Sequence, residues 1–367
     1  ATIRHLTPQA INISDQWGDA SFDADLHADF SASSLNDAVG SVDIRQLAMT
    51  SSKDHYHLNK LEITSGFDNG IHFVTVSSDF AEAKISGYFD YNTITGSITN
   101  FIGSKLPTLP GMPAYNPSAK NNFTVQAQIE SSDWLQKLLG IPLQLQQPVT
   151  INGSVNDHTR QIIFNGEFPQ FLYNNEPYHH GTVRIETPND SLHYDLSITK
   201  EMDNRDSFDL QLQGNAFDNH LSTMARWNNH ADKKMSGLIN TKAHFYTNHE
   251  GKQMAQINMM PSIINIHDTI WSVKPCNITY AKQYLHIDDF AISHDDQHLQ
   301  INGTASHLPS DSISINLHDI NRCLLVLICH AGDICLGILR QRTVLDIGPC
   351  PVSILLPAPV LVQGDLH

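Results

Sequence analysis

Cysteine is nearly absent from most of the chain, since Cys276 is the only one before position 322. No disulfide framework can form in this part, which suits either a reducing cytosol or a periplasm that avoids stray thiols. The chain begins with Ala1 rather than Met and lacks a charged segment followed by an apolar one at its start. We expect any signal or membrane anchor to lie upstream or to have been removed from a longer protein.

Common catalytic motifs are missing too. The sequence contains no Gly-x-Gly-x-x-Gly, phosphate loop, Gly-x-Ser-x-Gly, His-Glu-x-x-His, Cys-x-x-Cys or EF-hand loop. These motifs mark the common nucleotide-binding, hydrolytic and metal-dependent classes. We therefore expect a protein that is not an enzyme, with no catalytic residue and no cofactor.

Positive charge is scarce. The formal net charge is -16, from 38 acidic and 22 basic residues, and the Lys and Arg residues form no basic run. Such a chain repels a phosphate backbone, so nucleic acid is excluded as a partner. With 40% hydrophobic and 16% charged residues, the 367-residue chain is nevertheless expected to fold, with length for two or three domains.

Strand patterns dominate residues 1–321. Apolar residues recur at every second position in several runs: Phe123 to Ile129, Leu192 to Ile198, Phe208 to Leu212, Leu299 to Ile301 and Ile313 to Leu317. Period two places each set on one face of a strand. Turn-forming clusters separate the runs, at 68–70, 189–191, 203–206 and 294–296. The pattern predicts a nearly all-β fold, a long antiparallel meander.

Two helices are expected to interrupt this meander, near 93–105 and 133–139, with a loop over 106–122. In the first, Ile94, Ile98, Phe101 and Ile102 form one apolar stripe. In the second, Asp133 is the expected N-cap, and the side chains expected to be buried are Trp134, Leu135, Leu138 and Leu139. A weak internal similarity relates residues 58–90 to 285–321, each with an Ile-x-Gly bend, at 85–87 and 301–303.

The segment 322–367 differs from the rest. Cys323, Cys329, Cys335 and Cys350 arrive together, while Asn and Lys disappear. A membrane span over 323–339 and a cysteine-rich metal module are two interpretations, but the apolar run is short and the spacing fits no common zinc pattern. The favoured interpretation is a shifted-frame, non-functional tail without strand pairing.

The predicted sheet has more apolar surface than two short helices can cover, so we expect it to curl into an elongated, grooved sheet. An aliphatic groove suits lipid, because each buried CH₂ contributes about 0.8 kcal/mol. A sheet pair filled by its own side chains is the alternative. The candidate groove residues are Phe123, Val125, Ile129, Leu192, Leu196, Leu210, Leu212, Leu299, Ile301, Ile313 and Ile315.

Three groups of potential metal ligands are better explained without a metal. His179 and His180 are expected in a solvated surface turn, and the side chains of 294–298 should diverge on a hairpin tip. Asp23, Asp25 and Asp29 alternate around His27 but lack the glycine turn and bidentate Glu of a calcium loop. No metal site is predicted.

Several segments resemble the TamB-like and AsmA-like translocation and assembly module proteins of Bacteroidota. They are DTIW (268–271), ITY (278–280), LHIDDFAI (285–292), QHLQINGTAS (297–306), ITNFI (98–102), SKLP (104–107) and DWL (133–135). The resemblance covers about residues 1–321. It implies an inner-membrane-anchored periplasmic bridge, a curled β-taco-like sheet without catalytic residues. Its implied partners are phospholipid acyl chains and an outer-membrane β-barrel assembly partner.

A structural or adhesive β-protein remains the alternative function. Such a protein would bind protein or glycan through loops such as 106–122. An exposed aromatic platform, for instance Trp227 with Tyr246, would favour glycan, whereas a continuous aliphatic trough would favour lipid.

Overall fold

The computed structural model describes residues 1–318, except 13, 32–33, 53, 203–205, 233 and 267, together with the strand Thr343–Ile347. The fold is nearly all-β, with a long antiparallel sheet and two α-helices, which confirms the predicted fold class. The chain divides into two compact units. Unit 1 comprises Ala1–Lys105 and Pro113–Phe217, and unit 2 comprises Leu106–Met112 and Asp218–His367.

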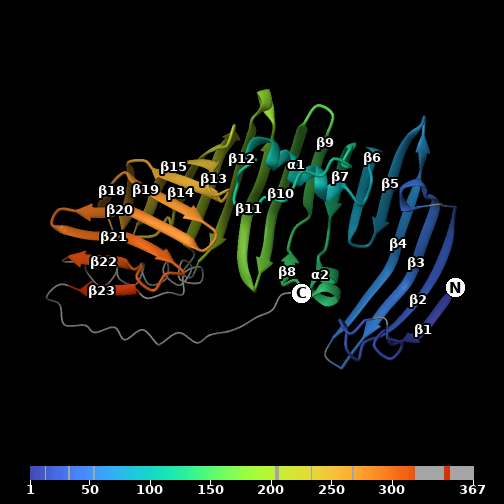
Figure 1. Cartoon of the computed structure of the whole chain (residues 1–367). Helices are drawn as coiled ribbons and strands as arrows, with labels where there is room; N and C mark the ends of the chain where they lie inside the picture. Colours follow the sequence, from blue (N-terminus) through green and yellow to red (C-terminus); the bar gives the residue numbers. More distant parts are fainter. Residues whose placement is uncertain are drawn as a thin grey trace. The chain divides into compact units, whose positions relative to one another are not determined.

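Unit 1 is a meander in which strands adjacent in sequence pair antiparallel, from β1 to β7 and from β9 to β13 (Figure 1). β7 pairs directly with β9, and the short β8 pairs with the far end of β10. The strands are β1 (Thr2–Leu6), β2 (Ser21–Ser31), β3 (Val39–Thr50), β4 (His55–Asp68), β5 (Ile71–Ser78), β6 (Ala81–Tyr88), β7 (Asn122–Ile129), β8 (Leu143–Leu145), β9 (Val149–Asn156), β10 (Gln161–Tyr173), β11 (Glu176–Glu186), β12 (Leu192–Glu201) and β13 (Ser207–Phe217).

Unit 2 continues the antiparallel pattern but contains a branch. The long β15 pairs with β16 along one half and with β17 along the other. On the first side β16 pairs with β19, and on the second side β17 pairs with β18. Both β19 and β18 then pair with β20. The strands are β14 (His220–Asn228), β15 (Met235–Thr247), β16 (Gln253–Met259), β17 (Ser262–Ile266), β18 (Thr269–Val273), β19 (Cys276–Ala281), β20 (Tyr284–His294), β21 (Gln297–Ser306), β22 (Ile313–His318) and β23 (Thr343–Ile347).

Turn residues behave as their chemistry predicts. The two-residue loop Asn69–Gly70 joins β4 to β5 with positive φ at both positions, which matches a hairpin turn of the primed type. Asp295 has positive φ in the loop between β20 and β21. The expected turn at 203–206 lies largely outside the described residues.

The two Ile-x-Gly bends share one backbone geometry. Gly87 (φ 142°) and Gly303 (φ 128°) lie inside strands. A Cβ on Gly87 would lie 2.3 Å from Asn122 O of β7, and one on Gly303 would lie 2.3 Å from the O of Ser312, just before β22. Gly40 in β3 repeats the arrangement with φ 133°. A side chain cannot be accommodated at these places, so glycine is required there.

Both predicted helices are present, as α1 (Ile94–Lys105) and α2 (Asp133–Leu139) (Figure 1). The predicted stripe of α1 is wrong in part, because its buried residues are Ser97, Phe101 and Lys105, whereas Ile98 is exposed. The expectation for α2 is also wrong. Its N-cap is Ser132, and none of its residues is fully buried. A two-turn helix with so few neighbours covers little surface.

Most of segment 322–367 lies outside the described residues. Within it, β23 pairs in parallel with β22 over Thr343–Ile347. The expectation that this segment lacks strand pairing is therefore wrong for these five residues. No helix in the described part of the chain has the length and apolar character needed to span a bilayer.

Candidate functional site

The strand register of unit 1 aligns apolar residues across ten strands. Directly paired residues share a face, and following the pairs from β3 to β13 gives a continuous row. Every member is aliphatic or glycine: Val42, Ile63, Val76, Ala83, Ala127, Ile151, Gly166, Val183, Leu196 and Leu212. We call this side of the unit 1 sheet the apolar face.

The next residues along the same strands form an entirely polar row on the opposite side. Its members are Asp43, Glu62, Ser77, Glu82, Gln128, Thr150, Glu167, Thr182, Ser197 and Gln211. We call this side the polar face. A slip of one residue in any strand would move the apolar residues of that strand to the polar face, so the segregation strongly specifies the register.

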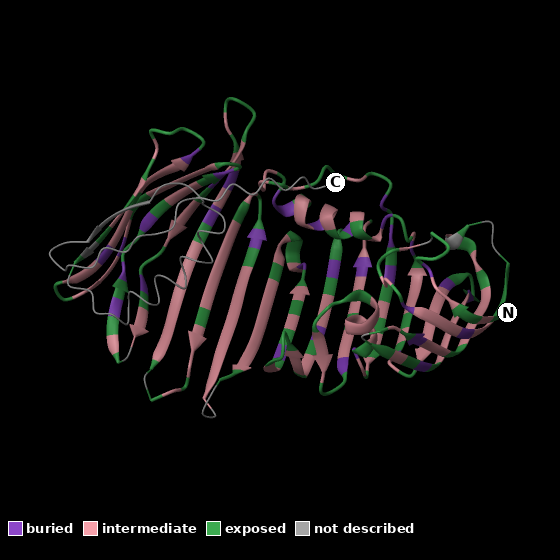
Figure 2. Ribbon diagram, turned by 90° about the horizontal axis from the view of Figure 1, so that it is seen from below, coloured by how far each residue is buried: buried purple, intermediate pink, exposed green. Residues whose placement is uncertain are grey.

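The residues of the apolar row are partly exposed to solvent. Of the row's ten residues, Gly166 is buried and the other nine are half-buried. Figure 2 shows the same intermediate exposure along most strands of the unit. Ten strands give nine steps of about 4.8 Å, so the row extends about 43 Å. One leaflet of a bilayer's hydrocarbon core is only about 15 Å thick. The row is therefore longer than an extended acyl chain.

Helix α1 covers one end of the apolar face. Its Phe101 belongs to a buried cluster with Phe89, Phe123, Val155 and Ile162, at the start of β7, the end of β9 and the start of β10. Helix α2 follows the opposite end of β7 (Figure 1). Along β7, the half-buried residue of the apolar row, Ala127, lies between the strand end covered by α1 and the strand end followed by α2.

A buried polar network fixes α1 to the strands. Asn121, which is 1% exposed, donates from Nδ2 to Ser97 Oγ at 2.6 Å and to Thr93 Oγ1 at 3.2 Å. Ser97 Oγ and the Asn121 backbone N–H both donate to Asp157 Oδ2 at 2.6 Å. Because the buried Thr93, Ser97 and Asn121 and the half-buried Asp157 satisfy one another's hydrogen bonds, the network holds the helix in one position. We call Thr93, Ser97, Asn121 and Asp157 the α1 latch.

An aromatic stack connects the protein surface with the buried cluster that contains Phe89 and Phe101. The His72 ring stacks on exposed Phe67 at 4.9 Å and on buried Phe89 at 4.8 Å. Burial lowers the pKa of His72, which favours its neutral form. Ser65 Oγ donates to Ala38 O, so it accepts from His72 Nε2, at 2.9 Å. The apolar cluster is thus continuous with an exposed aromatic side chain.

Unit 2 repeats the two-faced arrangement over seven strands. Its apolar row comprises Leu221, Ala243, Ile257, Ile278, Ile287, Gly303 and Ile313. The adjacent row on the other side comprises His220, His244, Gln256, Thr279, His286 and Thr304. A bulge in β20 at Asp289 (φ 55°) lets both Ile287 and Phe290 face the apolar side.

The register places all eleven predicted groove residues on the apolar side of their own unit. Phe123, Val125, Ile129, Leu192, Leu196, Leu210 and Leu212 do so in unit 1, and Leu299, Ile301, Ile313 and Ile315 do so in unit 2. Phe123 is only 7% exposed and lies in the cluster under α1, and Leu299 is 3% exposed. These two belong to the core, whereas the other nine are half-buried.

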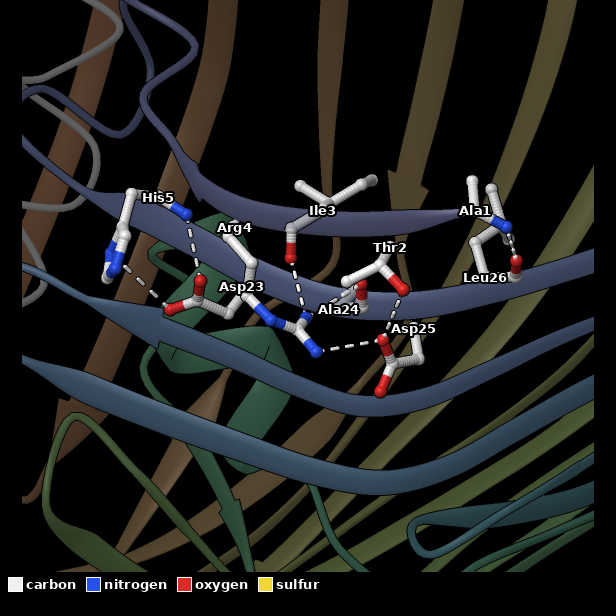
Figure 3. A network of polar contacts seen from close by, with 9 residues as sticks. All are labelled: Ala1, Thr2, Ile3, Arg4, His5, Asp23, Ala24, Asp25 and Leu26. Carbon is white, nitrogen blue, oxygen red and sulfur yellow. Dashed lines mark hydrogen bonds and ion pairs between the residues drawn. The ribbon is translucent and has the colours of Figure 1, made fainter.

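The N-terminal aspartates interact with protein side chains. Asp25 accepts from Thr2 Oγ1 at 3.0 Å and from Arg4 at 2.9 Å, and Asp23 accepts from the His5 backbone N–H at 2.8 Å (Figure 3). The hydrogen bonds from Thr2 and then Arg4 lower the pKa of Asp25. These contacts attach β1 to β2. Among the described residues, no group of three or more His, Cys, Asp or Glu is placed to hold a metal ion.

The expected turn at His179 and His180 is wrong. His179 and His180 lie within β11, at a β-bulge, and not in a turn. The aromatic platform that would favour glycan binding is not formed by Trp227 and Tyr246, because the register puts Trp227 on the side of Leu221 and Tyr246 on the side of His220. The Trp227 ring instead packs over Gly237.

A hollow of about 170 Å³ lies on the polar face of β10 to β13. Its lining includes Glu167, Arg184, Asp195, Ser197 and Gln211. Asp195 opposes Arg184 across the strands and accepts from Gln213 Nε2 at 2.9 Å. This hollow offers hydrogen bonds and charge, and it lies on the side opposite the apolar row.

Sequence reasoning missed the α1 latch. Ser97 and Asp157 are 60 residues apart in sequence, and none of the four members belongs to a recognisable motif. No family model matches the chain, and neither the curated proteins nor the solved structures include a match.

Proposed function

We propose that the chain is a non-catalytic segment of an inner-membrane-anchored periplasmic bridge protein. It handles phospholipid transfer or outer-membrane protein assembly between the inner and outer membranes, with acyl chains resting on its apolar face. The observation that carries this proposal is the half-buried aliphatic row across ten strands, backed by a fully polar row. The resemblance to TamB-like proteins supports the location and the outer-membrane assembly partner.

The energetics favour an acyl chain as the occupant. Each CH₂ removed from water contributes about 0.8 kcal/mol, and aliphatic residues line the row without interruption by charge. The row also runs across the strands, so a chain lying along it contacts side chains from successive strands. At Ala83, Ala127 and Gly166 the side chains are smaller than the Val, Ile and Leu at the other positions, so they leave more space above the sheet.

Native mass spectrometry of the chain purified without detergent tests the proposal. We expect bound phospholipid in the wild type and much less in Ala127→Phe, which fills the row. Gln126→Phe is the matched control, because it adds the same ring to the polar face of the same strand. Absence of lipid from the wild type, or equal loss in both variants, contradicts the proposal.

The hollow on the polar face supports a second candidate, a structural or adhesive protein that binds glycan or protein. Its lining of carboxylates, amides and one guanidinium suits a polar ligand. The variant Arg184→Ala, measured for both glycan binding and lipid content, distinguishes an adhesive function from lipid handling. Loss of glycan binding with unchanged lipid content would favour the second candidate, whereas unchanged glycan binding would dismiss this hollow as its site.

A further inference from the structure

The bulge in β11 places two consecutive histidines on the same face. His179 pairs with Thr199 and Thr182 pairs with Ser197, so β11 has one more residue than β12 between these pairs. Thr199 and Ser197 share a face of β12, and His180 lies two residues before Thr182. His180 has φ 53°, the left-handed conformation that absorbs the extra residue. Both imidazoles therefore project on the polar face.

The two rings converge through one nitrogen each. His179 Nδ1 and His180 Nδ1 are 3.2 Å apart, the ring centroids are 4.7 Å apart, and the ring planes meet at 77°. A metal ion lies about 2.0–2.1 Å from an imidazole nitrogen. Two nitrogens 3.2 Å apart then subtend an angle of roughly 100° at the ion, close to the tetrahedral value.

We propose that His179 and His180 form a two-histidine chelate for a late first-row divalent metal ion, with water at the remaining positions. Imidazole suits Zn²⁺, Ni²⁺ and Cu²⁺, and Cu²⁺ binds most tightly in this series. His180 is exposed, so an ion reaches the pair directly from solvent. The site is independent of the lipid function, because it lies on the opposite face from the aliphatic row.

Without metal, the same geometry is an N–H···N hydrogen bond in which one ring donates to the other. Metal binding requires a lone pair on both Nδ1 atoms. The ring that donated its Nδ1 proton moves to the tautomer protonated at Nε2, so both rings stay neutral and no proton is lost. The pair exchanges one hydrogen bond for two metal-nitrogen bonds.

A second histidine pair provides the control. His220 and His244 oppose each other on β14 and β15, and their ring centroids are also 4.7 Å apart. Their planes differ by only 21°, so the rings stack. The His220 Nδ1–H donates to Asp218 O at 2.7 Å, which removes that nitrogen as a ligand. Equal ring separation without converging nitrogens makes this pair a poor chelate.

Equilibrium dialysis of the full chain against CuCl₂, NiCl₂ or ZnCl₂ tests the proposal. We expect His179→Gln and His180→Asn each to remove one bound equivalent or weaken it at least about 100-fold, because the second imidazole acts at high effective concentration. Asn tolerates the left-handed conformation, so His180→Asn keeps the bulge. Circular dichroism should be unchanged.

His244→Gln should bind the same amount of metal as the wild type. Electron paramagnetic resonance of the Cu²⁺ complex should show two coordinated nitrogens in the wild type and one in His180→Asn. Unchanged binding in both bulge variants, or a loss confined to His244→Gln, would overturn the proposal and leave His179 and His180 as a hydrogen-bonded pair.

Discussion

The two helices of unit 1 differ both in the helix propensity of their residues and in how many of those residues are buried. Helix α1 contains Gly96, Gly103 and several β-branched residues, which are poor helix formers, yet three of its residues are buried. Helix α2 consists mostly of good helix formers and ends in a left-handed Gly140, yet none of its residues is fully buried. The comparison teaches that contacts with the strands, rather than propensity, hold α1 in place.

The strongest way to break the comparison is to remove the centre of the α1 latch. Asn121→Ala deletes the donor to Ser97 and Thr93 and the acceptor for the Asp90 backbone N–H. Several buried polar groups would lose partners, so we expect the free energy of unfolding to fall by about 3 kcal/mol. Denaturant titration measures it. The exposed neighbour is the control, and Asn122→Ala should change stability by less than about 0.5 kcal/mol.

The floor beneath α1 can be disturbed through the backbone alone. In Gly87→Ala the new Cβ would lie 2.3 Å from Asn122 O and 2.6 Å from Phe123 Cα, at φ 142°. We expect a loss of about 2 kcal/mol in unfolding free energy, because the strained backbone must shift. Thermal unfolding checks the prediction. An unchanged melting temperature would show that β6 and β7 can separate without disturbing the cluster.

A glycine-to-alanine change at the C-cap of α2 should cost less. Gly140→Ala places a side chain at φ 68° but has nothing within 4 Å of the new Cβ. Only the left-handed conformation is penalised, so we expect a loss of about 1 kcal/mol. Hydrogen exchange should show faster opening of α2 and unchanged protection of α1. Equal effects on both helices would contradict the view that α2 is anchored separately.

The smallest effect concerns the ion pair at the end of α1. The buried Lys105 ammonium pairs with Asp190, and the hydrogen bond from Lys105 lowers the pKa of that carboxyl. A carboxyl with a lowered folded-state pKa stabilises above its unfolded value of about 3.9, and this contribution disappears as pH falls towards the folded value. Asp190→Asn should therefore flatten the acid side of the stability profile below about pH 4. An unchanged slope would show that the pair contributes nothing measurable.

The alternation of apolar and polar residues made the strands, and the side of the sheet that each apolar residue faces, predictable from sequence. Val125 and Leu196 could be assigned to that side because period two is a local property. The latch could not be predicted, since Ser97, Asn121 and Asp157 meet only after β7 and β9 pair. The bulge at His180 could not be predicted either, because an extra residue in a strand leaves no compositional signal. Two adjacent polar histidines before a glycine instead suggested a turn.

The meander of unit 1 has a consequence for how its length can change. Strands adjacent in sequence pair with one another, and each carries the same polar and apolar alternation. Adding or deleting a two-strand hairpin preserves chain direction and both faces, and it changes the apolar row by about 10 Å. Gene duplication could therefore lengthen this surface in fixed increments, without requiring a new fold.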